Sequence, residues 1–257
     1  MPAMKKVLVI VPFPMTDDNR ALRQAQLASV ELGQDIRFEY RSVRAAPKNY
    51  ISASDLALAE IGMLEAGLRA EAEGFDAICI DTVSDSGVAA LRSELSIPVI
   101  GPGRAAMLTA MMLGNRFSIV TMWDQWRHLY EKTLADLGIG QACASIRALG
   151  LAPDNPSLMQ GKEEEIFPRL RDLAERCIAE DRAQVIVLGS TTMHQAHAYL
   201  AQSLPVPVIN PGPLSYKLAE ACLGLGLSHS RAAYPRTIAP RHDMIEAMLD
   251  AASAHQP

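Results

Sequence analysis

Two stretches of the chain match each other in order and in composition. Asp76-Ala-Ile-Cys-Ile-Asp-Thr82 and Gln184-Val-Ile-Val-Leu-Gly-Ser190 are short apolar runs that both end on a hydroxyl residue. Further along, Ile97-Pro-Val-Ile-Gly-Pro-Gly103 matches Val206-Pro-Val-Ile-Asn-Pro-Gly212. The last residues of the first pair are 108 positions apart, and those of the second pair are 109 apart. The two separations differ by only one position, which indicates that the whole order of elements is repeated.

Similar apolar, β-branched runs alternate with helical patterns along the chain, which indicates βαβ units and a mainly parallel sheet. Several runs are continuously apolar, as expected of strands that are covered on both faces. The predicted strands cover residues 6–11, 36–40, 77–80, 97–100, 117–121, 144–149, 184–188 and 206–209. The predicted helices cover 17–32, 54–73, 85–94, 104–113, 124–137, 162–180, 193–202, 214–224 and 241–252. Pro168 indicates that the sixth of these helices begins later or kinks there.

The repeat divides the sequence into two similar α/β halves, residues 1–115 and 116–225, and predicts a C-terminal helix over 240–253 that packs back on the first half. Ligands of open α/β sheets bind beyond the carboxyl ends of the strands. Thr82 and Ser190 follow the equivalent strand of each half. If the halves are related by a pseudo-twofold axis, these two hydroxyls can hold one substrate between them.

Composition excludes several classes of protein. The 257 residues carry 24 basic and 29 acidic side chains, which argues against a nucleic-acid or anionic-membrane surface. No apolar run approaches the ~20 residues of a membrane span, and Pro12 interrupts the N-terminal run, which shows no signal-peptide pattern. The four cysteines lie far apart, without zinc-binding spacing. We therefore expect a reduced, cytoplasmic protein that uses no metal or other cofactor.

The repeated blocks resemble the aspartate/glutamate/hydantoin racemase superfamily, and most of all its hydantoin and allantoin racemase branch. The similarity covers most of residues 5–225. In that family two flavodoxin-like, three-layer halves, each with a mainly parallel four-stranded sheet, enclose a small-molecule substrate. Two cysteines, one from each half, remove and return its α-proton. The resemblance implies an isomerase that is a homo-oligomer, a dimer or a tetramer. It rests on Asp76–Leu91 with Ser84-Asp85-Ser86-Gly87, Ile97–Met107, Phe117-Ser-Ile-Val-Thr121 and Val185-Ile-Val-Leu-Gly-Ser-Thr-Thr-Met193.

The positions that match the two family cysteines are Thr82 and Ser190. A thiol has a pKa of about 8.5 and reaches the thiolate form with modest help, whereas a hydroxyl needs a neighbouring base. The two-cysteine mechanism therefore does not transfer to this chain. Pro12 fits the opening motif of the family, but Phe13 and Pro14 stand where that motif has hydrogen-bonding groups.

The residues that follow Thr82 and Ser190 are expected to bind substrate. Each turn precedes a helix whose first N–H groups can bind an anion or a carbonyl oxygen, although such hydroxyls are also ordinary helix caps. In the related racemases these turns hold the substrate's carboxylate or ring carbonyl. The predicted substrate-binding residues of the turns are Val83, Ser84, Thr191 and Thr192.

Two side chains near these turns are candidate bases. His194 lies close to Ser190, with His197 at the helical i+3 position, and Asp81 ends a predicted strand. A metal role for the histidines lacks a third ligand. The alternatives are surface or interface histidines and an orienting role for Asp81.

Further pocket residues come from the resemblance. Thr121 ends the first strand of the second half and matches a pocket position of the family. Phe13 makes the roof of the pocket more apolar. Arg41, Arg44 and Tyr50 lie in the segment that closes over the pocket in the family, where a cation can bind a carboxylate.

The sequence thus predicts a cofactor-independent enzyme that acts on a hydantoin-like ring or an amino-acid-derived carboxylate. Three reactions remain open. The α-proton can be moved by Asp81, a histidine or water; the ring can be hydrolysed or opened by elimination, with Ser190 or water attacking; or the substrate can be decarboxylated through the same enolate, as by a lyase. A catalytically inactive, metabolite-binding homologue is the alternative from a different class.

Overall fold

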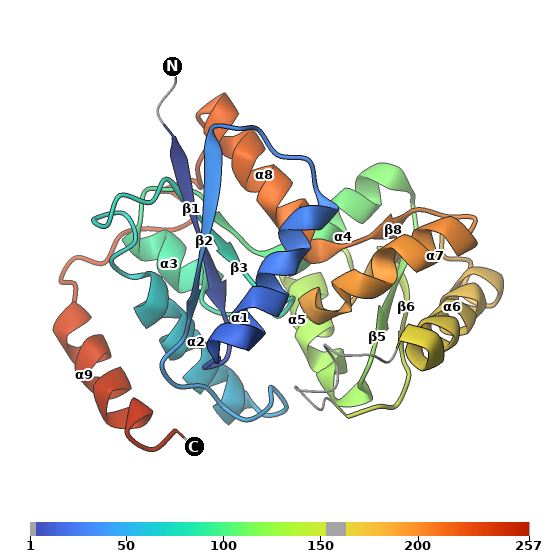
Figure 1. Cartoon of the computed structure of the whole chain (residues 1–257), viewed down its shortest axis with the longest axis horizontal. Helices are drawn as coiled ribbons and strands as arrows, with labels where there is room; N and C mark the ends of the chain where they lie inside the picture. The colour runs from blue at the N-terminus through green and yellow to red at the C-terminus, as the bar shows by residue number, and fades with distance from the viewer. Residues whose placement is uncertain (1–3, 153–162, 257) are drawn as a thin grey trace. The chain divides into compact units, whose positions relative to one another are not determined.

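The computed structural model describes residues 4–152 and 163–256 (Figure 1). The chain forms two compact units. Unit 1 consists of Met1–Gly101 together with Ser215–Pro257, and unit 2 is the continuous segment Pro102–Leu214. Each unit contains one sheet of four parallel strands.

The two sheets have the same strand order, which confirms the predicted α/β fold of two similar halves. In unit 1 the order is β2 (Ile36–Ser42), β1 (Lys5–Val11), β3 (Ala77–Ile80) and β4 (Val99–Ile100). In unit 2 it is β6 (Cys143–Ala148), β5 (Phe117–Thr121), β7 (Val185–Leu188) and β8 (Val208–Ile209).

The central strands are buried on both faces, as their continuous apolar sequences require. Every residue of β3 and β7 is buried. In unit 1, Ile78 and Ile80 pack in a cluster with residues of α2 and α3, whereas Cys79 packs in another cluster with Tyr216 of α8. Alternate residues of one strand thus supply two separate cores.

The helices flank these sheets. Unit 1 contains α1 (Asp17–Gln24), α2 (Ala53–Gly67), α3 (Val88–Glu94) and α9 (His242–Ser253), and unit 2 contains α4 (Pro102–Leu113), α5 (Arg127–Leu137), α6 (Glu163–Ala179) and α7 (His197–Ser203). Helix α8 (Pro211–Leu225) begins in unit 2 and continues in unit 1. Short 3-10 helices are η1 (Ala25–Ser29), η2 (Asp124–Trp126), η3 (Gly140–Ala142) and η4 (Thr191–Ala196).

Several predicted elements differ from the structure. The helix expected over 193–202 is divided into η4 and α7, and the strand expected over 206–209 is shortened to β8. The helix expected over 17–32 is divided into α1 and the tighter η1, which carries the fully buried Gln26. Helix α6 begins ahead of Pro168 and includes it, and the expected first residue, Lys162, lies outside the described residues. Strand β4 is shorter than expected because Pro98 has no N–H for the ladder; only its carbonyl is used, by Ile78.

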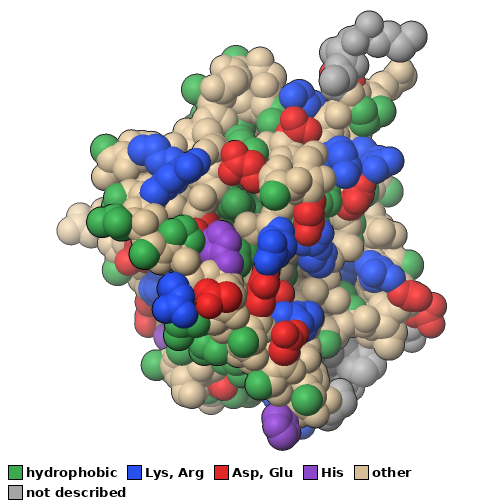
Figure 2. Space-filling model, turned by 90° about the vertical axis from the view of Figure 1, so that its left-hand side faces the viewer, with side chains coloured by type: hydrophobic (Ala, Val, Ile, Leu, Met, Phe, Trp, Pro, Cys, Tyr) green, Lys and Arg blue, Asp and Glu red, His purple; other side chains and the backbone are tan. Residues whose placement is uncertain are grey.

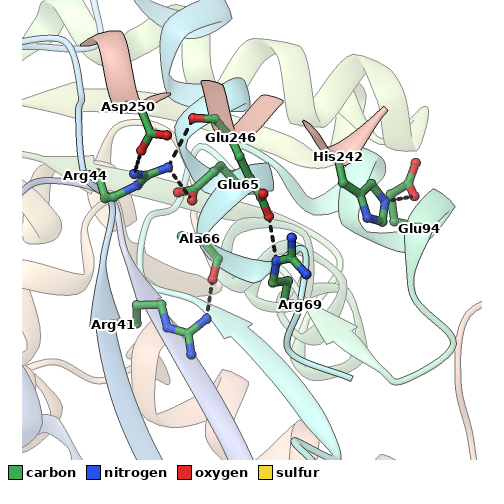
Figure 3. Close-up of polar contacts among 9 residues, drawn as sticks. All are labelled: Arg41, Arg44, Glu65, Ala66, Arg69, Glu94, His242, Glu246 and Asp250. Carbon is green, nitrogen blue, oxygen red and sulfur yellow. Dashed lines mark hydrogen bonds and ion pairs between the residues drawn. The ribbon is translucent and has the colours of Figure 1, made fainter. Parts of the chain in front are cut away.

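Helix α9 packs against α2 within unit 1 (Figure 3). Arg44 bonds to Asp250 and, at 2.8 Å, to Glu65 Oε1, and Arg69 Nε lies 2.6 Å from Glu246 Oε1. Arg41 donates to the carbonyl of Ala66. The two arginines that we considered as substrate ligands, Arg41 and Arg44, therefore have partners in unit 1.

Opposite charges lie next to each other on the surface drawn in Figure 2 rather than in separate patches. This mixture agrees with the near balance of 24 basic and 29 acidic side chains. In the part of the chain that the structure describes, no helix has both the length and the apolar character needed to cross a membrane.

The acid stability of unit 2 is expected to depend on Asp181. Hydrogen bonds from Arg147 lower the pKa of this carboxyl, and Ser145 adds another at 2.6 Å. The carboxylate therefore stabilises the fold above the unfolded-state pKa of about 3.9, and the contribution is lost as the pH falls through the lower folded-state value. Asp181→Asn should cost about 1–3 kcal/mol at neutral pH and nothing below the folded-state pKa.

Tryptophan fluorescence can follow this unfolding, because Trp123 and Trp126 both lie in unit 2. Asp136→Asn is the matched control, since its ion pair with Lys132 is largely exposed and is expected to contribute little. Equal effects of the two substitutions would contradict the prediction.

Candidate functional site

The first candidate turn follows β3 in unit 1. Thr82 comes two residues after the strand, and its Oγ1 lies 3.1 Å from Ser84 Oγ, which lies 2.9 Å from Ser86 Oγ. Ser84 and Ser86 are buried and Thr82 is half-buried. Three hydroxyls joined by two hydrogen bonds use two of their three protons. One of these three O–H groups is therefore left to donate to a further acceptor.

The second candidate turn follows β7 in unit 2 and is built alike. Ser190 is the N-cap of η4: its Oγ accepts from the N–H of Thr192 at 3.2 Å and lies 2.7 Å from Thr192 Oγ1. Two hydroxyls with one shared hydrogen bond again leave one O–H to donate. The repeat thus extends beyond Thr82 and Ser190 to the hydroxyls two positions later.

Two other predicted residues of the turns are buried. Val83 is 3% exposed and Thr191 is 2% exposed. Both residues are therefore largely shielded from solvent. The N–H groups of these turns belong to residues that lead into α3 and η4, where helix N-termini favour negative charge.

Asp81 is buried and paired on the strand side of the first turn. Its Oδ2 accepts a hydrogen bond from Arg23 Nη1 at 3.0 Å, and its Oδ1 accepts one from Gln26 Nε2 at 3.2 Å. All three side chains are at most 5% exposed. Sequence reasoning did not find Arg23 and Gln26, because nothing in the local pattern of α1 and η1 indicates that they point inward.

Tyr50 supports the loop that follows β1. Its Oη donates to the carbonyl of Pro12 at 2.9 Å, and its ring centroid lies 5.2 Å from that of Phe13. Burial raises the pKa of Tyr50, so its hydroxyl stays protonated. The strand register, with Ile10 beside Ile80, brings the Pro12 end of this loop to the same sheet edge as Thr82.

Thr121 is fully buried at the end of β5 and is bonded to Tyr130. Tyr130 Oη lies 2.8 Å from Thr121 Oγ1 and donates to the carbonyl of Gly189 at 2.7 Å. A Cβ at Gly189 would lie 2.7 Å from Tyr130 Oη and 2.8 Å from Thr121 Cβ. Glycine is therefore required just before Ser190. Tyr130 is a third residue of the site region, after Arg23 and Gln26, that the sequence did not reveal.

The two histidines do not share one α-helix. His194 is half-buried in η4, and His197 is the first residue of α7. His197 Nε2 lies 3.1 Å from the carbonyl of Val208, which it can reach only as a donor. Within residues 4–152 and 163–256, no group of three or more His, Cys, Asp or Glu side chains is arranged to hold a metal ion.

The four cysteines lie outside both turns. Burial raises the pKa of Cys79 and of Cys177, raises that of Cys143 to about 11, and raises that of Cys222. Thiolates are therefore disfavoured at neutral pH at all four positions, and no cysteine stands in for Thr82 or Ser190.

Comparison with known proteins agrees with this architecture. The family model for Asp/Glu/hydantoin racemases matches residues 21–219. The chain belongs to this family. A hydantoin racemase from Rhizobium meliloti is 34% identical over 195 residues, which cover 74% of this chain and 79% of that protein. A hydantoin racemase from Pseudomonas sp. (strain NS671) is 30% identical over 226 residues, which cover 88% and 89%.

Solved structures of the racemase family have the same fold. The allantoin racemase from Klebsiella pneumoniae matches with a TM-score of 0.81 and 29% identity, covering 92% of this chain and 96% of that one. A liganded variant of arylmalonate decarboxylase matches with a TM-score of 0.64 at 17% identity, covering 87% and 94%, which shows a shared fold. Family membership confirms the resemblance inferred from the repeat and makes this chain an enzyme of the isomerase/racemase superfamily.

Proposed function

We propose that the protein is a hydantoin-racemase-like enzyme that acts on a small hydantoin-like ring or an amino-acid-derived carboxylate. One substrate contacts both the 82–86 turn and the 190–192 turn, and no thiol takes part. The observation that carries the proposal is the matching pair of hydroxyl turns at the ends of β3 and β7, together with four cysteines that are all elsewhere.

The turns act as hydrogen-bond donors in this proposal. Each offers one hydroxyl proton to a carbonyl or carboxylate oxygen of the substrate. When the α-proton leaves, its electron pair moves toward that oxygen, and the donors stabilise the enolate. Removing one such donor from an enzyme typically costs a factor of about 10²–10³ in rate.

Proton removal requires a base, because hydroxyl groups have no anionic form at neutral pH. Of the two candidates, we assign this role to His194, since both oxygens of Asp81 accept hydrogen bonds from Arg23 and Gln26. His194 takes the proton from the α-carbon, and a water molecule delivers a proton to the opposite face through the hydroxyls of the opposite turn. The hydroxide left behind then takes the proton from His194, so that the inversion balances.

Decarboxylation is the second candidate, and the donor character of both turns favours it. The bond between the α-carbon and a carboxylate breaks, CO2 leaves, and the electron pair remains on the enolate. The enolate then takes a proton from a turn hydroxyl, which water replenishes. This reaction needs a proton donor and no base, so the residues of the turns suffice.

The test is incubation of the purified protein in D2O with a panel of hydantoins and substituted malonates. Optical rotation, α-deuterium uptake and mass are followed together. Loss of rotation with deuterium uptake supports racemisation, and loss of CO2 from a malonate supports decarboxylation. We expect Thr82→Val and Ser190→Ala to lower the rate about a hundredfold each.

Ser93→Ala and Ser203→Ala are matched controls, because among the described residues each hydroxyl bonds only to carbonyls of its own helix. Equal losses in the controls would contradict a role for the turns. Binding without any change in rotation, deuterium content or mass would overturn the enzymatic proposal in favour of a metabolite-binding homologue.

A further inference from the structure

We infer that Asp81 is a positioning residue, which Arg23 and Gln26 hold in the core of unit 1 so that it fixes the backbone of the 82–86 turn. This inference rests on the proposed function for the importance of the turn, but the geometry behind it is independent of any substrate. It assigns Asp81 a role other than proton acceptor.

The contacts tie three segments of unit 1 together. The N–H of Asp81 donates to the carbonyl of Ile10 at 2.9 Å and so extends the β1–β3 ladder by one bond. Its carboxylate accepts from Arg23, in the last turn of α1, and from Gln26, in η1. The turn after β3 is thereby linked to the helix that follows the Pro12–Phe13 loop.

The energetics of a buried ion pair favour such a role. Loss of one partner leaves an uncompensated charge and typically costs about 3–5 kcal/mol, whereas replacing both by apolar side chains is often neutral. The Asp81 carboxylate lies in the core of unit 1, where its two oxygens accept the hydrogen bonds from Arg23 and Gln26. A substrate proton taken up by this carboxylate would remove the charge that pairs with Arg23.

Unit 2 supports its turn at the equivalent place by different chemistry. The repeat aligns Asp81 with Gly189, which has no side chain. There the hydroxyl of Tyr130 occupies the adjoining space, donates to the Gly189 carbonyl at 2.7 Å and bonds to Thr121. Each hydroxyl turn is therefore held by a buried polar group just ahead of it: an ion pair in unit 1 and a tyrosine in unit 2.

Amide hydrogen exchange tests the inference without a substrate. In Arg23→Met we expect amides of residues 82–87 to exchange at least about tenfold faster than in the wild type, with those of 190–193 changed less than twofold. Tyr130→Phe should give the reverse pattern. Arg23→Lys, which keeps the charge, should fall between wild type and Arg23→Met.

If Arg23→Met does not fold, the double variant Arg23→Met with Asp81→Leu leaves no buried charge and carries the same expectation. Faster exchange in both turns to the same extent would show a general loss of stability and overturn the inference. Unchanged exchange at 82–87 in a folded variant would overturn it as well.

A kinetic arm separates positioning from proton transfer if the substrate panel yields a reaction. Asp81→Asn should lower kcat, because it leaves the buried charge of Arg23 uncompensated and so loosens the turn, but it should leave the pH profile unchanged, because no titrating base is lost. A loss of a hundredfold or more with an altered acid limb would identify Asp81 as the base. If the panel yields no reaction, the proposed function fails while the exchange experiment still decides the inference.

Discussion

The double variant Thr82→Cys with Ser190→Cys is expected to exchange the α-hydrogen of a substituted hydantoin at least about a hundredfold faster than the wild-type protein. The resemblance to the family matches both residues to its two cysteines, and Ser190 is the N-cap of η4, where a helix N-terminus lowers the pKa of a thiol. A thiolate is a base at neutral pH, whereas the present hydroxyls are too weakly acidic to form the corresponding anion. Deuterium uptake measured by NMR in D2O gives the rate.

Each single cysteine variant is expected to racemise more slowly than the double variant, because inversion needs proton transfer on both faces. Cys79→Ser is the control for the native thiols; its side chain is fully buried in β3 and should not matter for exchange. A folded double variant without any gain in exchange would show that the turns do not hold a substrate as the proposal requires.

Gly87→Ala is expected to destabilise unit 1 by about 2–4 kcal/mol. Gly87 ends the first candidate turn with φ +81, a conformation unfavourable to alanine, and an added Cβ would lie 2.5 Å from Met63 Cβ. Its N–H also donates to Glu60 at 2.7 Å. Urea unfolding followed by far-UV circular dichroism measures the loss.

Gly74→Ala is the matched control for this prediction. Gly74 has nearly the same backbone conformation, φ +82, but nothing lies within 4 Å of its added Cβ. Gly74→Ala should lower the free energy of unfolding only by the cost of placing an alanine at a positive φ, about 1–2 kcal/mol. The difference between the two variants therefore measures the clash with α2. If both cost the same, the close approach of Gly87 to Met63 carries no energy and the prediction is wrong.

Much of the fold could be predicted because its signals are local. Continuous apolar runs in β3 and β7 identify buried strands, and the repeat of strand, hydroxyl turn and helix identifies two equivalent sheets. The same local signal drew attention to Thr82 and Ser190. The predicted boundaries of helices and strands differ from the structure where a proline shortens a strand, as at Pro98, and where a 3-10 helix replaces part of an α-helix, as at η1.

The side chains behind the turns could not be predicted, because they come from distant segments. Arg23 is 58 residues from Asp81, and Tyr130 is 59 residues from Gly189. Each lies on a helix whose spacing predicts only which face is apolar. An arginine in such a helix is usually solvated. Only the folded structure shows that this arginine pairs with a carboxylate in the core.

Unit 1 is assembled from both ends of the polypeptide, and this has a consequence for biosynthesis. Tyr216 and Ala219 of α8 cover the face of the first sheet that contains Val7 and Val9. On the ribosome, β1 to β4 emerge early, yet this apolar face is covered only in part, by residues such as Leu27 and Val30, until the whole of unit 2 has been translated. Nascent chains are therefore most vulnerable to aggregation during that interval, and a stop codon ahead of α8 would leave them permanently exposed.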